Sequence, residues 1–413
     1  MPKLRAAVRR LLRGGDDAAG DRPRPKRRYL ADALEGVARV RAAGHDRPMV
    51  LATWPLDREN PFQTLLTSRA DEFGIVPIGM DRLADLDEPV GLPSLVALRA
   101  DGVEIVLHLH WLARVLRGVT SEAEGRDRVT SFLAALDTFL AAGGRLVWTV
   151  HNVLPHETRF PALDLELRRV VVARADVVHV LSAGTVEAAA PSYEIPAAKV
   201  LHVLHPAYLG VYPDDVSDAD ARARIGIAPE DIVFGVVGKL RPYKGLDDLL
   251  DAFETLAASP PDARRRRLLI AGMPAADPSI EALLARSRAH PDVIVDARHI
   301  PAEDLSVPLR ASDVIVLPYR ASLNSGALLL ALSFGRPVIA AASPHVSETV
   351  GPDASITFDP TARGALTAAL RDADRLLTPA ARDAALATAR RFDPDEISRQ
   401  FATSLRDRLD RSG

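Results

Sequence analysis

Cysteine is absent from this sequence, lysine is scarce, and no apolar run is long enough to cross a bilayer. Without cysteine the chain can form neither disulfides nor thiolate metal sites, so the sequence does not indicate a redox compartment. No stretch approaches the roughly 20 apolar residues of a transmembrane helix, and we identify no signal peptide. A formal net charge of −3 over 413 residues lacks the positive excess typical of nucleic-acid-binding proteins. We therefore expect a cytoplasmic protein with no nucleic-acid partner.

The first 28 residues differ from the rest of the chain in charge. They hold ten lysines and arginines against three aspartates. Leu4, Ala7, Val8, Leu11 and Leu12 recur at the spacing of one helix face. A short basic amphipathic helix would suit an anionic membrane surface, which would make the protein peripheral at the inner face of the plasma membrane. A solvated basic tail is the alternative interpretation.

From residue 45 onward, apolar runs that suit β-strands alternate with helical patterns. The expected strands cover residues 49–53, 75–78, 104–110, 146–150, 177–181, 200–204, 232–237, 268–271, 293–295, 314–317, 338–341 and 355–358. Strands that alternate with helices predict an α/β fold with parallel sheets covered on both faces. Because the two series of strands are of nearly equal length, we expect two doubly wound, Rossmann-like domains that face each other across a cleft.

Proline, glycine and aspartate interrupt both periodicities between residues 205 and 220, which indicates a domain boundary. We therefore expect a basic segment over 1–28, an N-terminal domain over 29–205 and a C-terminal domain over 206–390. The spacing of Ile397, Phe401, Leu405 and Leu409 predicts a helix within 391–413. We expect this last helix to cross back to the N-terminal domain.

Two of the five lysines of the chain lie in one short loop, although the other 47 cationic side chains are arginines. Lys239 and Lys244 follow an apolar strand and precede a helical pattern. Lysine is a compact point charge on a flexible stem, and a strand–glycine loop–helix unit directs N–H groups and cations at a phosphate. The sequence therefore indicates an anion site, with an ordinary solvated turn as the alternative.

A second candidate anion site follows the predicted strand that ends at residue 317. Asn324 or Ser325 is expected to cap a helix that ends at Gly335, and Gly326 leaves the first turn sterically open. An open helix N-terminus with a hydroxyl beside it can bind an anion. We expect it at the same sheet edge as Lys239 and Lys244. A normally capped buried helix is the alternative.

Histidine motifs end two consecutive strands of the N-terminal half, with His110 at the end of the first and His151 directly after the second. Histidine near a strand end can serve as acid or base near neutral pH. His151 is the first catalytic candidate, with His110 and Glu157 in reserve. A zinc site formed by His108, His110, a further histidine and a glutamate is one alternative. Hydrogen-bonded core histidines are another.

The C-terminal half resembles GT-B-fold glycosyltransferases of the family 4 kind. The resemblance rests on Gly238-Lys239-Leu240, Lys244-Gly245, Gly335-Arg336-Pro337-Val338 and Ser347-Glu348, and it covers most of residues 195–390. It implies transfer of a sugar from a UDP- or GDP-linked donor to the hydroxyl of a carbohydrate or lipid-linked acceptor, in glycolipid or polysaccharide assembly. It also implies that no metal cofactor takes part.

The resemblance assigns roles to individual residues. The donor diphosphate would be bound by Lys239, Lys244, Asn324, Ser325 and Gly326, and the acceptor by Trp54, Asn60 and Trp111. His151 corresponds to the strand-end histidine that these enzymes place beside the donor sugar and acceptor hydroxyl. Weaker candidates for the nucleoside and ribose contacts are Arg298, His299, Ile300 and Glu348.

One feature departs from the family pattern. Two glutamates usually precede the Gly-x-Pro-Val segment, and their positions here hold Ser322 and Leu330, which resembles a bacterial subgroup with Leu323-Asn324-Ser325-Gly326. Two other functions therefore stay open: a degenerate GT-B module that binds a nucleotide sugar without turnover, and a nucleotide-sugar epimerase.

Overall fold

The computed structural model describes residues 28–155, 157–258, 264–320 and 322–411. The chain divides into two compact units. Of the described residues, the C-terminal domain comprises Ala207–Asp393, and the N-terminal domain joins residues 28–206 to residues 394–411. The basic segment predicted over 1–28 lies outside the described residues, apart from Arg28. No described helix is both long and apolar enough to span a membrane.

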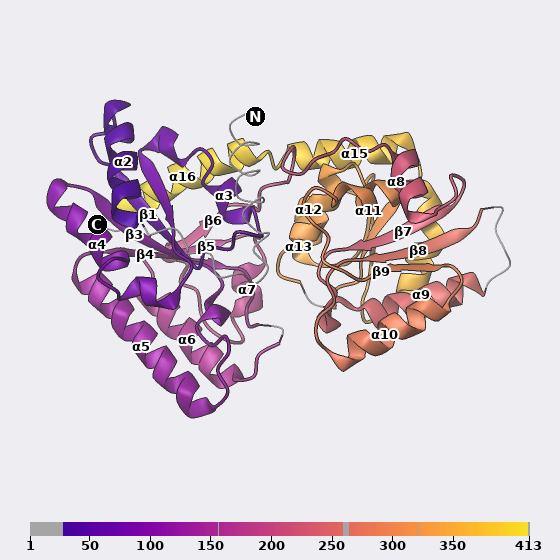
Figure 1. Cartoon of the computed structure of the whole chain (residues 1–413), viewed down its shortest axis with the longest axis horizontal. Coiled ribbons are helices and arrows are strands. Elements are labelled where there is room, and N and C mark those ends of the chain that lie inside the picture. Colours follow the sequence, from indigo (N-terminus) through magenta and orange to yellow (C-terminus); the bar gives the residue numbers. More distant parts are fainter. Residues whose placement is uncertain (1–27, 156, 259–263, 321, 412–413) are drawn as a thin grey trace. The chain divides into compact units, whose positions relative to one another are not determined.

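The N-terminal domain is built on a six-stranded parallel sheet with the order β2-β1-β3-β4-β5-β6 (Figure 1). Its strands are β1 (Met49–Trp54), β2 (Ile75–Gly79), β3 (Glu104–Leu109), β4 (Arg145–Val150), β5 (Val177–Val180) and β6 (Val200–His202). Its helices are α2 (Tyr29–Ala42), α3 (Phe62–Leu66), α4 (Leu92–Val96), α5 (Glu122–Ala141), α6 (Pro161–Arg174), α7 (Thr185–Ala189) and α16 (Pro394–Arg411).

Helix α16 covers one face of the N-terminal sheet together with α3. Its buried residues recur every four positions, so one stripe of the helix faces the sheet: Ile397, Phe401, Leu405 and Leu409. They pack against Met49, Leu51 and other buried strand residues. The C-terminal segment is therefore part of the core of the N-terminal domain.

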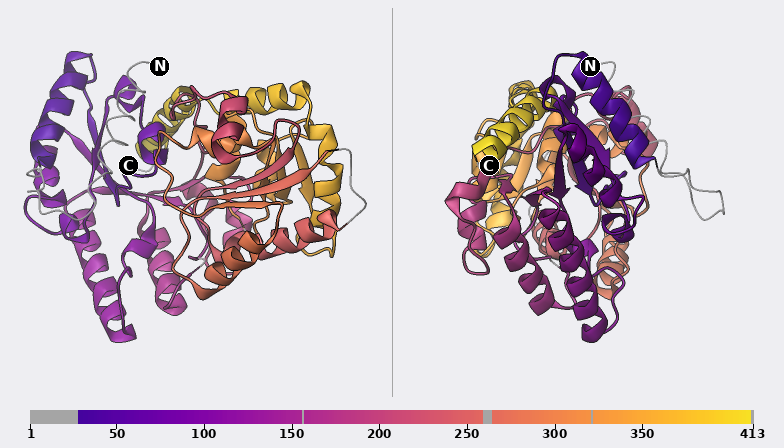
Figure 2. Two further views of the ribbon diagram at one scale, coloured as in Figure 1. Left: turned by 45° about the vertical axis from the view of Figure 1, so that its right-hand side comes forward. Right: turned by 90° about the vertical axis from the view of Figure 1, so that its left-hand side faces the viewer.

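The C-terminal domain has a second six-stranded parallel sheet, with the order β12-β11-β10-β7-β8-β9. In Figures 1 and 2 helices lie on both sides of its strands. Its strands are β7 (Ile232–Val237), β8 (Arg266–Ala271), β9 (Val293–Asp296), β10 (Val314–Leu317), β11 (Val338–Ala341) and β12 (Ser355–Phe358). Its helices are α8 (Asp218–Ile225), α9 (Leu246–Ala257), α10 (Pro278–Ala289), α11 (Ser306–Ala311), α12 (Gly326–Ser333), α13 (Pro344–Thr349), α14 (Ala365–Arg371) and α15 (Pro379–Arg390).

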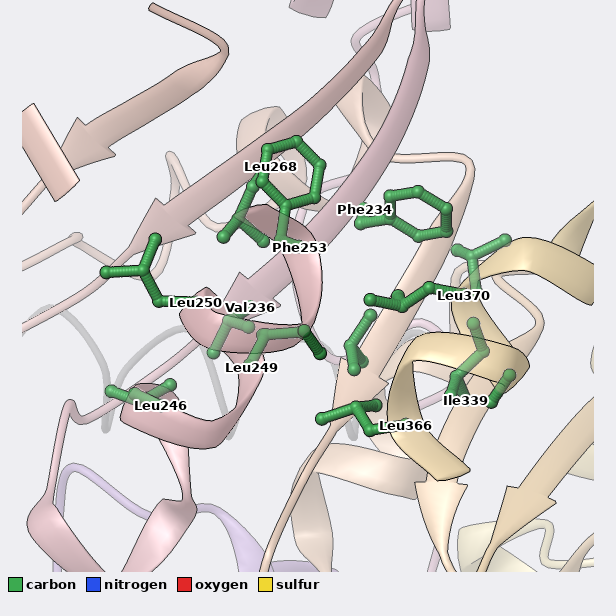
Figure 3. Packing of buried hydrophobic residues seen from close by; sticks show 14 of the residues in the cluster. Phe234, Val236, Leu246, Leu249, Leu250, Phe253, Leu268, Ile339, Leu366 and Leu370 are labelled. Carbon is green, nitrogen blue, oxygen red and sulfur yellow. The ribbon is translucent and has the colours of Figure 1, made fainter. Parts of the chain in front are cut away.

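Alternate residues of β7 point to opposite faces of this sheet, as strand geometry requires. Phe234 and Val236 join the apolar cluster under α9, α10 and α14, part of which is drawn in Figure 3. Val233 points the other way and packs with Ala221 and Ala311 from α8 and α11. Both faces of the sheet are therefore buried, which explains why β7 reads as a continuous apolar run.

The structure confirms the predicted fold class and every predicted strand, with ends that shift by one or two residues. The order of each sheet reverses once, between β1 and β3 in the N-terminal domain and between β10 and β7 in the C-terminal domain. Open parallel sheets bind ligands outside the carboxyl ends of strands at such a reversal. We therefore expect a ligand site at the reversal point of each domain.

Candidate active site

In the C-terminal domain, both predicted anion-binding segments lie at the point where the strand order reverses. Strands β7 and β10 are parallel neighbours, so their carboxyl ends lie at one edge. The loop with Lys239 and Lys244 follows β7, and the turn that leads to Ser325 follows β10. The two segments touch, because a Cβ atom on Gly245 would lie 2.2 Å from the carbonyl oxygen of Pro318.

The loop after β7 is held against the loop after β8. The Leu240 N–H donates to the Met273 carbonyl at 2.8 Å, and the Ala275 N–H donates to the Leu240 carbonyl at 2.9 Å. Gly272 has φ +144°, and a Cβ atom there would lie 1.8 Å from the Gly238 carbonyl oxygen. Only glycine allows this close approach of two backbones. Sequence reasoning missed Gly272, because its requirement comes from a neighbouring strand.

Lys244 is a buried cation without a counter-ion in the described part of the chain. Its side chain is 8% exposed, and its ammonium lies 5.3 Å from the centre of the Tyr319 ring. Burial, together with Arg241 and Lys239, lowers the pKa of Lys244 to about 8. A desolvated ammonium with only an aromatic face nearby is costly unless an anion joins it. Lys239, five residues earlier, is exposed.

Ser325 caps helix α12 and connects three elements. Its Oγ accepts the N–H of Leu328 at 3.2 Å, and its own N–H donates to Nε2 of His345 on α13 at 3.0 Å. Ser325 also shares a hydrogen bond with the hydroxyl of Tyr319. Asn324 is not the cap, and its backbone oxygen accepts a hydrogen bond from Ser322 at 2.8 Å. Of the two predicted caps, the structure selects Ser325, with Gly326 in the first turn.

A small cavity of about 60 Å³ lies beside this turn, at the carboxyl ends of β10 and β11. It is lined by Leu317, Tyr319, Arg320, Ser322, Ser325, Ala340, Ala341, Ala342, Ser343 and Val346. The exposed Arg320 bridges Asp248 at 2.6 Å and Asp247 at 3.0 Å, which ties the turn to the start of α9. Small side chains from the end of β11 onward, Ala340 to Ser343, line one side of this cavity.

The weaker nucleoside candidates do not gather around Lys244. Arg298, His299 and Ile300 follow β9, the edge strand, and β8 lies between β9 and β7. The Arg298 guanidinium pairs with Asp296 at 2.8 Å, and Ile300 packs against the apolar cluster of α8 and α11. Ile300 is half-buried, and its contact with a nucleoside stays a prediction. Glu348 lies on α13, half-buried, one turn after His345.

In the N-terminal domain, His110 and His151 meet at the ends of β3 and β4. His110 Nδ1 lies 3.0 Å from His151 Nε2, a hydrogen bond between two imidazoles. The ring of Trp111 stacks on His151 with centroids 4.3 Å apart, and the Phe62 ring meets His151 edge-on at 5.2 Å. His110 lies at the reversal point between β1 and β3. The sequence indicated each histidine separately, and the structure shows that the two rings are hydrogen-bonded to each other.

A second hydrogen-bonded line lies beneath this pair. His179 Nε2 donates to the Val203 carbonyl at 2.9 Å, so in the neutral ring Nδ1 accepts the Thr149 hydroxyl at 3.0 Å. The Thr149 oxygen then accepts Nε2–H of His108 at 2.7 Å. Because the Val203 carbonyl can only accept, the donor and the acceptor of each hydrogen bond in this line are determined. His179 and Thr149 were not singled out from the sequence, because their pairing requires three neighbouring strands.

The buried histidines are held neutral. Burial and the neighbouring imidazoles lower the pKa of His108 and of His110 well below the ordinary value. Burial lowers the pKa of His179 to about 4. A neutral imidazole donates one hydrogen bond and accepts one, as His179 does between Val203 and Thr149. A catalytic histidine here would therefore be available as a base at neutral pH.

Acidification is expected to destabilise the N-terminal domain. In the unfolded chain His179 takes up a proton near its ordinary pKa of 6.5, whereas in the folded domain it does so only near pH 4. Protonation below pH 6.5 therefore favours the unfolded chain. Once the pH is below both pKa values, this pKa difference lowers the free energy of unfolding by about 3 kcal/mol. The other buried histidines lower it further. Urea unfolding at steps from pH 7.5 to pH 5 should show a falling free energy of unfolding. A constant or rising value over this range would contradict the neutral assignment.

One of the predicted acceptor contacts, Trp54, needs correction, and Asn60 stays a prediction. Trp54 is 1% exposed and its indole N–H donates to the Arg82 carbonyl at 2.9 Å, so its ring is a core element and presents no face to a ligand. The Asn60 side-chain oxygen accepts the Phe62 N–H at 3.1 Å, which makes Asn60 a structural turn residue at the start of α3. Trp111 stays half-buried beside His151. Glu157 is exposed in the loop after β4.

The alternative metal site is not supported by the geometry of the histidines. His110 and His151 direct ring nitrogens at each other, and His108 directs Nε2 at a hydroxyl. Within the described ranges, which omit His156, no group of three histidine, aspartate or glutamate side chains is arranged to hold a metal ion.

Comparison with known proteins extends these observations. Residues 231–374 match the family model described as glycosyl transferases group 1. A GDP-mannose:glycolipid 4-beta-D-mannosyltransferase of Xanthomonas campestris is 29% identical over 252 residues, which are 60% of this chain. The match spans 65% of that relative's length. A D-inositol 3-phosphate glycosyltransferase of Actinosynnema mirum is 33% identical over 159 residues, or 36% of this chain and 37% of the relative.

Solved structures show the same fold. HepE of Anabaena, in complex with UDP and glucose, aligns with a TM-score of 0.62 at 16% identity and covers 87% of this chain and 100% of its own. Sucrose-phosphate synthase of Thermosynechococcus elongatus aligns with a TM-score of 0.58 at 17% identity, covering 87% and 99%. The chain thus has the GT-B glycosyltransferase fold, and residues 231–374 of its C-terminal domain carry the sequence pattern of the group 1 glycosyl transferases.

Proposed function

We propose that this protein is a glycosyltransferase that moves a sugar from a nucleoside diphosphate donor to a hydroxyl of a glycolipid or polysaccharide acceptor. The observation that carries the proposal is Lys244, a buried ammonium with no carboxylate partner among the described residues, at the sheet edge where the strand order reverses. The sequence match to group 1 glycosyl transferases covers this edge. The C-terminal domain would bind the donor and the N-terminal domain the acceptor.

The donor diphosphate would be bound by Lys239, Lys244 and the first turn of α12. Negative charge grows on the diphosphate as its bond to the sugar breaks, and fixed cations and N–H dipoles stabilise that charge. The Ser325 hydroxyl and the N–H groups that follow Gly326 in the chain supply the dipoles. The proposal includes no metal, because these groups provide the positive charge that the reaction requires.

His151 would accept the proton of the acceptor hydroxyl. The hydroxyl oxygen bonds to the anomeric carbon of the sugar, the bond between that carbon and the diphosphate oxygen breaks, and the proton passes to His151. Since His151 Nε2 faces His110, the proton would be taken at Nδ1. His110 Nδ1 would meanwhile accept Nε2–H of His151 and fix that tautomer. The half-buried Trp111 ring offers a face to an acceptor sugar.

GDP-mannose is the first candidate donor and a glycolipid the first candidate acceptor. Both come from the name of the Xanthomonas campestris relative, whose match extends over 60% of this chain. UDP-linked sugars are the second candidate, because HepE was solved with UDP. Ser322 and Leu330 occupy the positions where family 4 enzymes carry two glutamates, and this favours one further candidate, a module that binds nucleotide without turnover.

Calorimetric titration with UDP, GDP and ADP, each with and without EDTA, tests the donor assignment. We expect tight binding of one nucleotide that EDTA does not change. Failure of all three to bind, or binding that requires a metal, would refute the diphosphate site. Release of free nucleotide from GDP-mannose in the presence of a glycolipid acceptor would then separate an enzyme from a binding module.

A lipid-linked acceptor would place the enzyme in the cytoplasm at the inner face of the plasma membrane, attached through residues 1–28. The support is the ten cationic residues and the apolar spacing of that segment. Removal of residues 1–28 is expected to abolish co-sedimentation with anionic vesicles at low salt. Equal sedimentation of the truncated and the full-length protein would contradict the attachment.

A further inference from the structure

One buried histidine of the C-terminal domain has no role in the mechanism above. His345 lies in the first turn of α13, directly after β11, and is 3% exposed. Its Nε2 accepts the backbone N–H of Ser325 at 3.0 Å. We propose that His345 is a positioning residue for the donor, which holds the Ser325 turn so that the start of α12 faces the diphosphate. The inference rests on the proposed function.

The hydrogen bond determines which nitrogen of His345 carries the proton. Because the Ser325 N–H is the donor, Nε2 is unprotonated and the neutral ring carries its proton on Nδ1. Nδ1 is buried and has no hydrogen-bond partner among the described residues. Burial lowers the pKa of His345 to about 4, so the ring stays a neutral acceptor over the ordinary pH range. Within the described part of the chain, the hydrogen bond to Ser325 is therefore the only polar contact of this side chain.

Ser325 transmits this contact to the rest of the donor site. Its Oγ accepts the N–H of Leu328 in α12, and it shares a hydrogen bond with the Tyr319 hydroxyl. The ring of Tyr319 in turn lies 5.3 Å from the Lys244 ammonium. A change at His345 is therefore expected to affect the start of α12, Tyr319 and Lys244, through Ser325, which is the one proposed donor-binding residue that His345 contacts among the described residues.

The bond to His345 also selects which N–H groups can meet an anion. The Ser325 N–H is occupied, so that residue can contribute only its hydroxyl. The next two N–H groups, of Gly326 and Ala327, belong to half-buried residues in the first turn of α12. First-turn N–H groups have no partner within their own helix. With the Ser325 N–H held by His345, these two N–H groups would be the ones to donate to the diphosphate.

Three substitutions at this position separate positioning from folding. In His345→Gln the amide oxygen can reach the former place of Nε2 and accept the Ser325 N–H. In His345→Asn the amide reaches only the place of Nδ1, and in His345→Leu no acceptor is present. We expect the dissociation constant of the nucleoside diphosphate to rise about tenfold in the Asn and Leu variants and to return to within about threefold of wild type in the Gln variant.

Steady-state kinetics should show the same order. The KM for the nucleotide sugar is expected to rise in the Asn and Leu variants, with kcat changed less, because the acceptor and His151 are untouched. Thr349→Val is the matched control, since Thr349 is buried on the same helix and its hydroxyl donates only to the His345 carbonyl. The control is expected to bind nucleotide like wild type.

A spectroscopic readout covers the case in which a variant folds poorly. In ¹⁵N-histidine-labelled wild-type protein, the signal that disappears in His345→Gln should have the shifts of an Nδ1–H tautomer. An Nε2–H tautomer would overturn the proposal, as would equal nucleotide affinity in the Gln, Asn and wild-type proteins or an equal loss in Gln and Asn. If the wild-type protein binds no nucleoside diphosphate, the proposed function is wrong, and the role inferred for His345 is wrong as well.

Discussion

Replacing Lys244 with methionine is expected to weaken nucleoside diphosphate binding about 100-fold, which is the size of effect seen when one partner of a buried charge pair is removed. The same change should leave the unfolding midpoint unchanged or raise it. The reason is that the free protein buries this ammonium without a carboxylate partner in the described chain, so an apolar side chain of similar length removes a desolvation cost. Calorimetry and thermal unfolding of the same samples measure both quantities.

Lys199→Met is the matched control for this experiment. The Lys199 ammonium donates to the carbonyls of Val172 at 3.1 Å and Ala173 at 2.8 Å, in the last turn of α6. Its removal should cost stability and leave nucleotide affinity unchanged, the reverse of the Lys244 result. If both lysine variants bind nucleotide like wild type, the diphosphate assignment is wrong.

The pH dependence of nucleotide binding gives an independent check on Lys244. Its pKa of about 8 in the free protein means that the ammonium deprotonates as the pH rises through that value. Binding of a diphosphate requires the charged form, so affinity should fall above about pH 8 in wild type. In Lys244→Met this decline should disappear.

Replacing His151 with alanine is expected to lower the rate of sugar transfer by a factor of about 10² to 10⁴, the usual contribution of a general base. Donor affinity should stay near wild type, because the proposed diphosphate contacts belong to the C-terminal domain. Turnover assays with a nucleotide sugar, together with calorimetry, separate the two effects. Retention of more than about half of the transfer rate would assign the proton to another group.

His110 and the pH profile refine that test. His110→Ala should lower the rate less than His151→Ala, because it removes only the contact that fixes the tautomer of His151. Burial and neighbouring histidines lower the pKa of His151, so the acidic limb of kcat/KM should lie below pH 6.5. His202→Ala, at an exposed histidine on β6, is the control and should be active.

Local sequence patterns were sufficient for the elements of this protein and for one half of its candidate site. Apolar runs such as 232–237 could be assigned because both faces of each sheet are buried, so burial and sequence agree. The lysine loop and the Ser325 helix start could be predicted because each is a continuous segment whose chemistry is local. Their common edge followed from the rule that parallel strands end on one side.

The hydrogen-bond and packing partners of individual side chains could not be predicted from local sequence patterns. Nothing in the sequence distinguishes Trp54, which is core, from Trp111, which flanks the histidine pair, because each comes directly after a predicted strand, 49–53 or 104–110. The line from His108 through Thr149 to His179 joins three strands, and hydrogen bonds across strands depend on register.

The sequence alone therefore determined the fold class, the strands and the chemistry of the donor loops, because these depend on periodicity and on residues close together in the chain. Only the tertiary structure showed that Lys244 is buried over Tyr319, that Gly272 must lack a side chain and that His345 holds Ser325. Each of these facts is a contact between segments that lie twenty or more residues apart in the chain. Such contacts arise from packing and register, which a single sequence does not encode in any local pattern.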